Sequence, residues 1–216
     1  MDFEQARFNM IEQQIRPWDV LDLDVLALLA IVKREDFVPA AQRALAFMDV
    51  ELPLGGGRSM LAPRVEARLL QELHVQRHEH VLEIGAGSGY MAALLGHKAQ
   101  RVIAMEIDPA LAKQAAANLA RAGAKNVEVR EGDGAAGLPG EGPFDVILLS
   151  GSVQSVPLAL VAQLKTGGRL VAVVGDEPMM RAMLYTKTAD GLAERVLFDT
   201  VAPRLQGFGQ RSEFAF

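Results

Sequence analysis

Cysteine is absent from this chain of 216 residues. Its absence excludes disulfide bonds, thiolate metal sites and a covalent thiol nucleophile. Cationic residues are not in excess either, because 22 lysines and arginines stand against 27 aspartates and glutamates, which gives a formal net charge of -5. Binding to nucleic-acid phosphates is driven by clustered cations, so we expect no nucleic-acid partner.

Long hydrophobic runs are also missing. The longest run near the N-terminus, "VLALLAIV" at residues 25–32, is far shorter than the roughly 20 residues that a membrane-spanning helix needs. The first residues, "MDFEQARFNM", include an early acid and no basic segment followed by an apolar one, so they do not resemble a secretory signal. Half of the residues are apolar, which is typical of a packed globular protein. We therefore expect a soluble, cytoplasmic protein.

The chain changes character at about residue 79. From there, short β-branched runs alternate with helical segments, which is the pattern of βαβ units. The tail departs from this pattern, because "MLYTKT" and "GLAERVLFDTV" suggest a hairpin followed by the Gly-punctuated end "RLQGFGQRS". The pattern predicts an α/β fold with a Rossmann-like, doubly wound, mainly parallel sheet. The predicted strands are "HVLEI", "RVIAMEI", "NVEVREGD", "FDVILLS" and "GGRLVAVVG", and the intervening helices include "GYMAALLGHKA" and "DPALAKQAAANLARAG". In the second of these helices, we expect Asp108 to be the cap, and Pro109 suits the first helical position.

The first predicted strand leads into the glycine-rich turn "EIGAGSGY". Gly85 and Gly87 fit a dinucleotide-binding pattern, but the third position is Tyr90 and the last glycine comes one residue early, at Gly89. No Lys-Ser/Thr pair follows, so a Walker-type phosphate loop is excluded as well. The turn allows the backbone to approach a ligand closely, yet it lacks the two commonest phosphate signatures.

Two acidic residues follow the next two predicted strands. Glu106 ends the second strand, about 20 residues after the loop begins, where a carboxylate can accept both ribose hydroxyls. Asp133 ends the third strand, where it can accept from an adenine amino group, and Gly134 leaves room for the ring. Each acid taken alone is also explained as a solvated residue at a strand end. In register along one βαβαβ pattern, they describe a site for an adenosine without phosphates, and S-adenosylmethionine is such a ligand.

Several blocks of this sequence resemble the protein-L-isoaspartate O-methyltransferases. The blocks are "REDFVP", "LPLGGGRSMLAP", "VLEIGAGSGY", "GDGAAGLP", "FDVILLSG…VP" and "LVAQLKTGGRLVAVVG". The resemblance implies methyl transfer from S-adenosylmethionine to the α-carboxyl of L-isoaspartyl residues in damaged proteins, which is a protein repair reaction. It also implies an N-terminal helical cap with a substrate and cofactor loop at residues 1–78, and a Rossmann-like, cofactor-binding methyltransferase core at residues 79–216.

The resemblance also implies a set of site residues. The segment "SMLA" at residues 59–62 is expected to pack against the cofactor and face the substrate. The serines at the end of the strand "FDVILLS" and after it are expected to border the substrate. The expected cofactor contacts are Ser59, Met60, Leu61, Ala62, Glu66, Glu83, Gly85, Gly87, Ser88, Gly89, Glu106, Ile107, Asp133 and Gly134, and the expected substrate contacts are Arg64, Ser150, Gly151 and Ser152.

One departure from the family pattern affects the chemistry. The family usually reads Thr-Ile-Ser where this chain reads Ser59-Met60-Leu61, so the position of the serine associated with catalysis holds a leucine. Ser59 lies two positions earlier and is the candidate catalytic hydroxyl, because residues i and i+2 of an extended segment share a face. Arg64 replaces an aromatic residue or histidine, and it either pairs with a substrate carboxylate or lies on a solvated helix face.

Two alternatives therefore remain open. The chain could methylate another carboxylate or a small-molecule acceptor with the same fold, or it could bind the cofactor without turnover. Nucleic-acid bases are disfavoured as acceptors, because the usual C5-pyrimidine chemistry needs a cysteine and the Asn/Asp-Pro-Pro-aromatic tetrad of amino-group enzymes is missing. We expect no metal site, because no acid completes a set of ligands with the histidines of "HVQRHEH".

Overall fold

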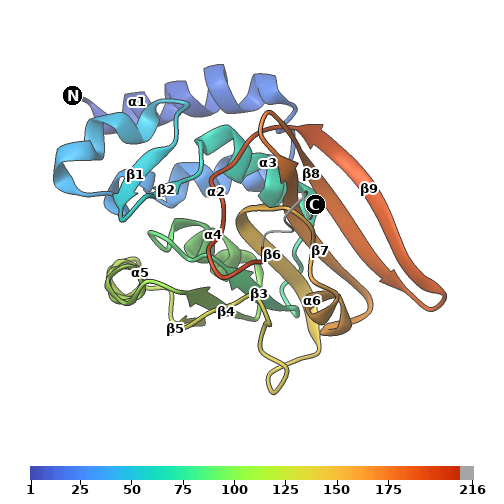
Figure 1. The fold of residues 1–216 in the computed structure, drawn as a ribbon. Helices are drawn as coiled ribbons and strands as arrows, with labels where there is room; N and C mark the ends of the chain where they lie inside the picture. Colours follow the sequence, from blue (N-terminus) through green and yellow to red (C-terminus); the bar gives the residue numbers. More distant parts are fainter. Residues whose placement is uncertain (210–216) are drawn as a thin grey trace, which may run out of the picture.

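A seven-stranded sheet forms the centre of the computed structural model, which describes residues 1–209. The strand order is β5-β4-β3-β6-β7-β8-β9 (Figure 1). All pairs from β5 to β7 are parallel, whereas β7, β8 and β9 are antiparallel. The predicted Rossmann-like, mainly parallel architecture is therefore confirmed.

The parallel half follows the alternation of the sequence. The central strands β6 and β7 contain nearly continuous buried apolar runs because other elements cover both faces, whereas the edge strand β5 alternates with charged residues. Asp108 caps α5 as predicted, since its Oδ1 accepts from the N–H groups of Ala110 and Leu111. The elements are β3 (His80–Ile84), α4 (Tyr90–Lys98), β4 (Arg101–Glu106), α5 (Pro109–Arg121), β5 (Val127–Glu131), β6 (Phe144–Val153), α6 (Leu158–Ala162) and β7 (Leu164–Asp176).

The predicted hairpin of the tail is confirmed. It consists of β8 (Met179–Thr188) and β9 (Gly191–Asp199), and it projects from the rest of the molecule at the right of Figure 1. After β9, the chain turns back and runs across the middle of the molecule in that view. There it forms a short parallel bridge between Arg204 and Ser152 of β6.

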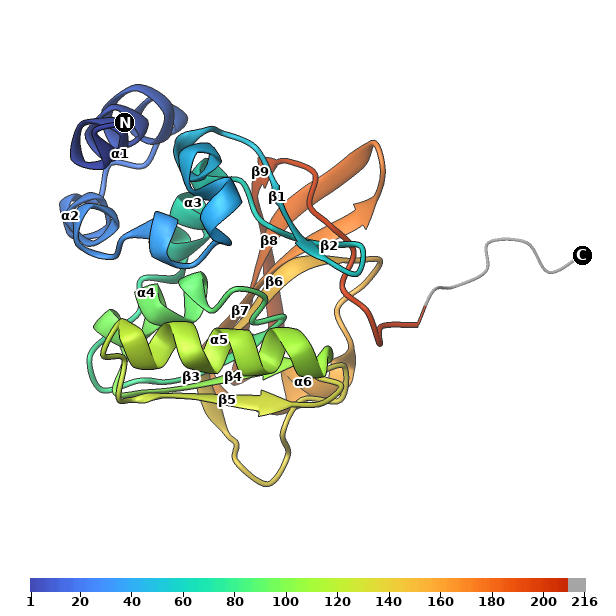
Figure 2. The same cartoon turned by 90° about the vertical axis from the view of Figure 1, so that its left-hand side faces the viewer.

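The N-terminal region is helical, as expected, but less regular than its sequence pattern. The first helix begins as α1 (Phe3–Met10) and widens into a π-helical turn (Ile11–Ile15). α2 (Leu23–Ile31) and α3 (Pro63–Leu73) are regular, and a 3₁₀ segment (Ala40–Phe47) lies between them. Figure 2 shows these elements gathered above α4, on one side of the sheet.

The glycine-rich segment before α3 contains a hairpin that the sequence pattern did not predict. Its strands are β1 (Leu52–Gly55) and β2 (Arg58–Met60), which pair antiparallel. Three successive glycines, residues 55–57, have positive φ at the turn, a conformation that other residues rarely adopt. The segment is therefore an ordered part of the fold, and it points Ser59 toward the carboxyl ends of the parallel strands.

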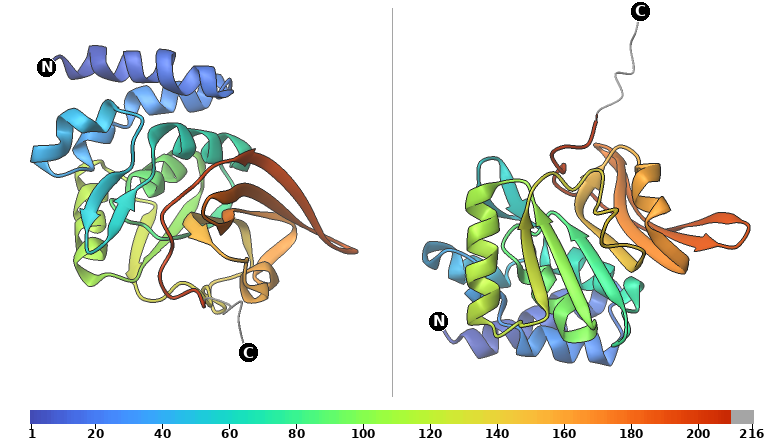
Figure 3. Two further views of the ribbon diagram at one scale, coloured as in Figure 1. Left: turned by 45° about the horizontal axis from the view of Figure 1, so that its top comes forward. Right: turned by 90° about the horizontal axis from the view of Figure 1, so that it is seen from below.

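The buried side chains form two clusters, one on each face of the sheet. One cluster joins the N-terminal helices to the sheet, since Met10, Leu29 and Leu70 belong to it together with Leu94 and Val146. The predicted division at residue 78 thus passes through a shared hydrophobic core. Figure 3 shows the N-terminal helices and the sheet from two further directions. The predicted range 79–216 includes residues 210–216, which lie outside the described part of the chain.

No helix within residues 1–209 is both long enough and apolar enough to span a bilayer.

Candidate active site

A cleft of about 570 Å³ opens where the parallel strands β3, β4 and β6 end, which is the usual ligand position in doubly wound sheets. We call it the strand-end cleft. The structure brings together residues that are far apart in the sequence, from the β1–β2 hairpin to the segment after β9. The predicted site residues that line it are Ser59, Gly85, Gly87, Glu106, Ile107, Gly134 and Ser150.

The glycine turn after β3 is held against the end of β4. The Gly87 N–H donates to Glu106 Oε2 at 2.8 Å, and the Asp108 N–H donates to Glu106 Oε1 at 3.0 Å. Gly89 begins α4 with a φ of 83°, and a Cβ atom there would lie 3.2 Å from the Ala115 carbonyl oxygen of α5. The turn is therefore tightly packed, and Glu106 combines an ordering role with a position on the cleft wall.

Glu83 lies in β3 directly behind the cleft wall and is fully buried. Ser150, which lines the cleft, donates from its hydroxyl to Glu83 Oε1 at 2.6 Å. Glu83 Oε2 has no hydrogen-bond partner among the described residues. Burial, together with the negative charges of Glu66 and Glu106, raises the pKa of Glu83 to about 8 against the opposing effect of the Ser150 hydrogen bond. This carboxyl group can still accept a hydrogen bond or face a cation.

The segment after β9 closes one side of the cleft, which the sequence pattern did not predict. Residues 203–207, called the strap here, are fixed to β6 by hydrogen bonds from the Ser152 N–H to Pro203 O at 2.7 Å and from the Leu205 N–H to Ser152 O at 2.9 Å. Gly207 lies so close to Asp133 that a Cβ atom there would stand 2.2 Å from Oδ1. Residues 203–206 of the strap line the cleft, whereas the predicted residues Gly151 and Ser152 support it.

Arg58 is a second unpredicted part of the cleft wall. From the β1–β2 hairpin, its guanidinium contacts Asp108 Oδ2 at 3.0 Å and donates to Gln206 Oε1 at 2.7 Å. It thus connects the hairpin, the start of α5 and the strap. A single surface arginine gives no sequence signal for such a role, because its partners lie 50 and 148 residues away.

The segment that departs from the family pattern has two faces. Ser59 lines the strand-end cleft, whereas Leu61 is only 4% exposed and packs into the hydrophobic core. The backbone carbonyl of Leu61 accepts from Arg34 Nη2 at 2.6 Å, and Arg34 also pairs with Glu66. Arg34 is fully buried, so it holds this segment from the core side. The block "REDFVP" contains Arg34, but its pattern did not indicate that role.

The remaining predicted residues lie beside the cleft rather than on its wall. Asp133 Oδ1 accepts from the Ala135 N–H at 2.9 Å, and Ser88 accepts from the Tyr90 N–H at 3.3 Å at the start of α4. Arg64 pairs with Asp49 at 2.8 Å and stacks on Trp18, so its guanidinium is already engaged. Residues outside the cleft lining are Met60, Leu61, Ala62, Arg64, Glu66, Glu83, Ser88, Gly89, Asp133, Gly151 and Ser152.

The histidines of "HVQRHEH" form no metal centre that the structure describes. Within residues 1–209, no group of three histidine, aspartate or glutamate side chains is arranged to hold a metal ion. His80 lies at the start of β3 and contacts Gln100 through Nε2 at 3.0 Å. The strand-end cleft is thus the place where the predicted residues converge.

The sequence model of the family protein-L-isoaspartate(D-aspartate) O-methyltransferase matches residues 5–202. The chain belongs to this family. It is 39% identical over 192 residues to protein-L-isoaspartate O-methyltransferase 1 of Syntrophobacter fumaroxidans, covering 89% of this chain and 90% of that protein. It is 38% identical to the protein-L-isoaspartate O-methyltransferase of Methanoculleus marisnigri, covering 97% of this chain and 96% of that protein. The family membership predicted from the sequence blocks is confirmed.

Solved structures show the same fold. One protein-L-isoaspartate O-methyltransferase superposes with a TM-score of 0.79 at 25% identity and covers 93% of this chain, which spans 66% of that chain. A second structure, from Plasmodium falciparum, superposes with a TM-score of 0.76 at 20% identity over 94% of this chain and 99% of that one. That protein, a beta-aspartate methyltransferase, was solved in complex with S-adenosyl-L-homocysteine. The second likeness bears on the fold alone.

Proposed function

We propose that this protein is an S-adenosylmethionine-dependent carboxyl methyltransferase that acts on the α-carboxyl of L-isoaspartyl residues in damaged polypeptides. The observation that carries the proposal is the convergence of the glycine turn and Glu106 on one strand-end cleft in a member of this family. The relatives that match most of the chain are named for this activity.

Residues on the cleft wall and directly beside it fit the cofactor. Glu106 and Asp133 stand at the ends of β4 and β5, where an acid can accept hydroxyl or amino donors of an adenosine. The unpartnered Oε2 of the buried Glu83 is suited to a cationic group, because a nearby positive charge favours the ionised carboxylate. When bound, S-adenosylmethionine supplies an activated methyl group on a sulfonium.

The protein needs no general base for this reaction. An α-carboxylate has a pKa near ~3.5 and is ionised at neutral pH. The task of the site is to align that carboxylate and to exclude water, and positioning alone contributes up to ~7–11 kcal/mol. The replacement of the family's serine by Leu61 therefore removes an orienting hydroxyl. It does not remove a proton acceptor that the reaction needs. We propose that Ser59, which lines the cleft, orients the acceptor carboxylate.

Direct transfer assays test this function. The purified protein is incubated with S-adenosylmethionine that carries a labelled methyl group and with paired peptides that differ only in aspartyl or isoaspartyl linkage. Base-labile label is expected on the isoaspartyl peptide alone. The Gly87→Val variant serves as the negative control. A Cβ atom at this position would lie 3.2 Å from Leu54, and the backbone there has a positive φ that residues with side chains rarely adopt.

Other outcomes favour the remaining alternatives. Label on a metabolite and on neither peptide would indicate a different carboxylate or small-molecule acceptor. Tight cofactor binding without transfer to any acceptor would indicate that turnover has been lost, as the leucine at position 61 suggests. The cytoplasmic location and the absence of a nucleic-acid partner, both expected from the sequence, remain predictions.

A further inference from the structure

A second groove, of about 1180 Å³, lies beyond the strand-end cleft. We call it the Trp18 groove. Its walls come from Trp18 at the end of the first helical segment, residues 49–51, the start of α3 at Arg64, Pro178 with the start of β8 at residues 179–181, and residues 199–201. The Arg64 guanidinium lies 3.9 Å from the centre of the Trp18 ring and pairs with Asp49 at 2.8 Å. This stack fixes one wall of the groove.

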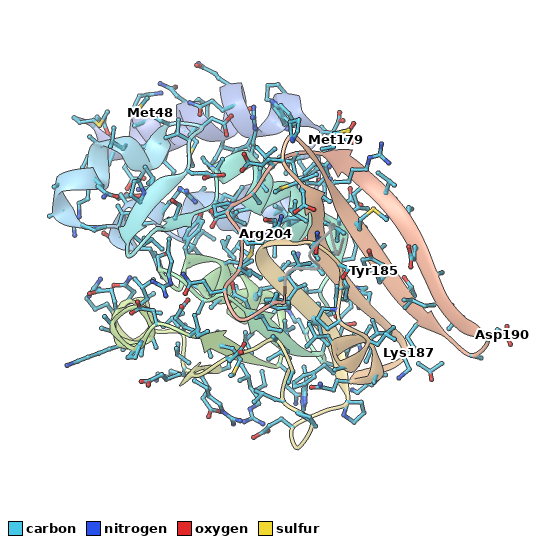
Figure 4. All side chains as sticks on the ribbon, in the orientation of Figure 1. Met48, Met179, Tyr185, Lys187, Asp190 and Arg204 are labelled. Atoms are coloured by element: carbon cyan, nitrogen blue, oxygen red, sulfur yellow. The ribbon has the colours of Figure 1, made fainter. Side chains whose placement is uncertain are left out.

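Exposed apolar side chains surround this groove. Trp18 is 40% exposed, Val50 42%, Val201 48% and Met179 83%, and all four line it. Figure 4 shows Met179 at the end of β8 that is opposite to the hairpin tip, where Asp190 lies. Scattered exposed apolar residues are normal, whereas apolar residues gathered around one groove indicate a binding surface.

The groove also has uncompensated negative charge. Asp49 and Asp199 are paired with Arg64 and Arg181. Glu51, which lines the groove, and its neighbour Glu177 have no ion-pair partner within residues 1–209. Partial desolvation by the groove walls raises the pKa of Glu51, and the charge of Glu177 raises it further. A cation placed beside these two carboxylates would favour their ionised forms and so oppose the rise in the pKa of Glu51.

The Trp18 groove and the strand-end cleft share two segments of the chain. Ser59 lines the cleft, and Ala62, three residues later, lines the groove. In the same way, residues 203–206 line the cleft and residues 199–201 line the groove. A polypeptide that presents one carboxylate near Ser59 therefore has its neighbouring residues within reach of the groove, since an extended chain spans about 3.3 Å per residue.

We propose that the Trp18 groove binds the part of the acceptor polypeptide that flanks the methylated residue, and that it selects an apolar side chain next to a basic one. The apolar side chain packs among Trp18, Met179 and Val201, and the basic side chain lies beside Glu51 and Glu177. This inference rests on the proposed carboxyl methyltransferase function. It adds a preference for sequence context to that function.

Binding can be measured without turnover, because Trp18 is the only tryptophan of the chain. Its fluorescence reports directly on occupation of the groove. The probes are four isoaspartyl peptides that combine two choices at two positions. Leucine or serine is next to the isoaspartyl residue, and lysine or glutamate lies within three residues of the isoaspartyl residue on either side of it. The leucine–lysine peptide is expected to change Trp18 fluorescence and to bind about three- to tenfold more tightly at low salt than the leucine–glutamate peptide.

Two matched pairs of variants locate the effect. Glu51→Lys is expected to reverse the preference between lysine and glutamate, whereas Asp190→Lys, an equal charge change at the hairpin tip, is expected to leave it unchanged. Met179→Ser is expected to weaken binding of leucine peptides several-fold, with cofactor affinity unchanged. Leu158→Ser, at a residue that is 81% exposed on α6, is its control and is expected to have no effect.

The outcomes separate this inference from the function on which it rests. Methylation of all four peptides with equal KM and no fluorescence change would overturn the groove assignment and leave the function standing. Selective fluorescence changes without methyl transfer would support the groove and count against the function. If sedimentation shows a dimer that Met179→Ser dissociates, a second copy occupies the groove and the inference is wrong.

Discussion

The strand-end cleft and the Trp18 groove are built in different ways. The cleft is organised by consecutive βα units, so its glycines and acids occur at regular spacing along the sequence. The groove is assembled from five separate stretches between Trp18 and Val201, of which only the one that begins at Ala62 overlaps a family sequence block. A site at the ends of parallel strands can be anticipated from local pattern, whereas a surface made from loop ends depends on how the helical cap and the β8–β9 hairpin are placed.

The largest expected effect concerns Leu61, which lies between the two sites. Leu61→Ser places a hydroxyl at a position that is 4% exposed within the core. Loss of apolar contacts and burial of the hydroxyl are expected to lower the free energy of unfolding by about 2–4 kcal/mol. Urea unfolding followed by circular dichroism measures this change. A change near zero in the free energy of unfolding would mean that residue 61 faces an open site. The comparison between the strand-end cleft and the Trp18 groove would then need revision.

The next effect tests the acid of the cleft. Glu106→Gln removes the negative charge and one of the two acceptor oxygens, which weakens the hydrogen bonds from the N–H groups of Gly87 and Asp108 and the proposed contact with the ribose hydroxyls. Affinity for S-adenosylhomocysteine is expected to fall about 10- to 100-fold, because hydrogen bonds to charged groups contribute about 1.5–3 kcal/mol. Isothermal calorimetry measures this change, and Glu194→Gln on β9 is the control. Groove binding of the peptides should persist in both variants.

Glu83 gives the cleft a pH dependence. Burial raises its pKa to about 8 in the folded protein, above the value of about 4.3 expected in the unfolded chain. The folded state then binds more protons across this interval, so the free energy of unfolding falls as pH rises from about 4.5 to 8. Glu83→Gln should reduce this fall by about 1–2 kcal/mol.

Thermal unfolding of both proteins between pH 5 and pH 8 measures that contribution. S-adenosylmethionine should stabilise the parent chain more at pH 8 than at pH 6, relative to Glu83→Gln, because a cation favours the ionised carboxylate. Parallel pH profiles for the two proteins would show that Glu83 does not titrate in this range. In that case, Glu83 would not contribute a pH-dependent charge to the cleft.

The smallest effect is expected at Arg58. Arg58→Ala removes the contacts with Asp108 and Gln206 that connect the β1–β2 hairpin to the strap. These contacts are partly exposed, so their contribution is about 0–1 kcal/mol. Dissociation of S-adenosylhomocysteine from the immobilised protein, followed by surface plasmon resonance, should become at most about fivefold faster. Arg130→Ala, at an arginine on β5 that pairs with Glu128 and Glu141, is the matched control. Equal release from both variants would show that the strap does not depend on Arg58 and is held by its backbone bonds to β6 and by the pair of Arg204 with Asp176.

Much of the fold followed from local pattern. The parallel strands, the capped helix α5 and the terminal hairpin were predicted, because apolar runs, an Asp-Pro start and the change in the tail are local signals. The β1–β2 hairpin was not, because glycines mark a turn without specifying which flanking residues pair. The widening of the first helix into a π-helical turn likewise has no local signal.

The candidate site divides in the same manner. Gly87, Glu106 and Gly134 were predicted and line the cleft, because strand ends in a parallel sheet converge at one edge. Arg58 and the strap could not be predicted, because their contacts join segments separated by up to about 150 residues. Arg64 was assigned either a substrate carboxylate or a solvated face; its contacts with Trp18 and Asp49 could not be read from the sequence, and its role toward a substrate stays a prediction.

The sequence by itself determined the fold class, the family and the edge of the sheet where a cofactor fits, because these depend on periodicity and on residues that follow strands. The tertiary structure alone decided that Leu61 is buried while Ser59 faces the cleft, and that the strap closes it. It also decided that Trp18 borders a groove. These features depend on which distant segments meet, and that is set by packing of the shared core rather than by any local pattern.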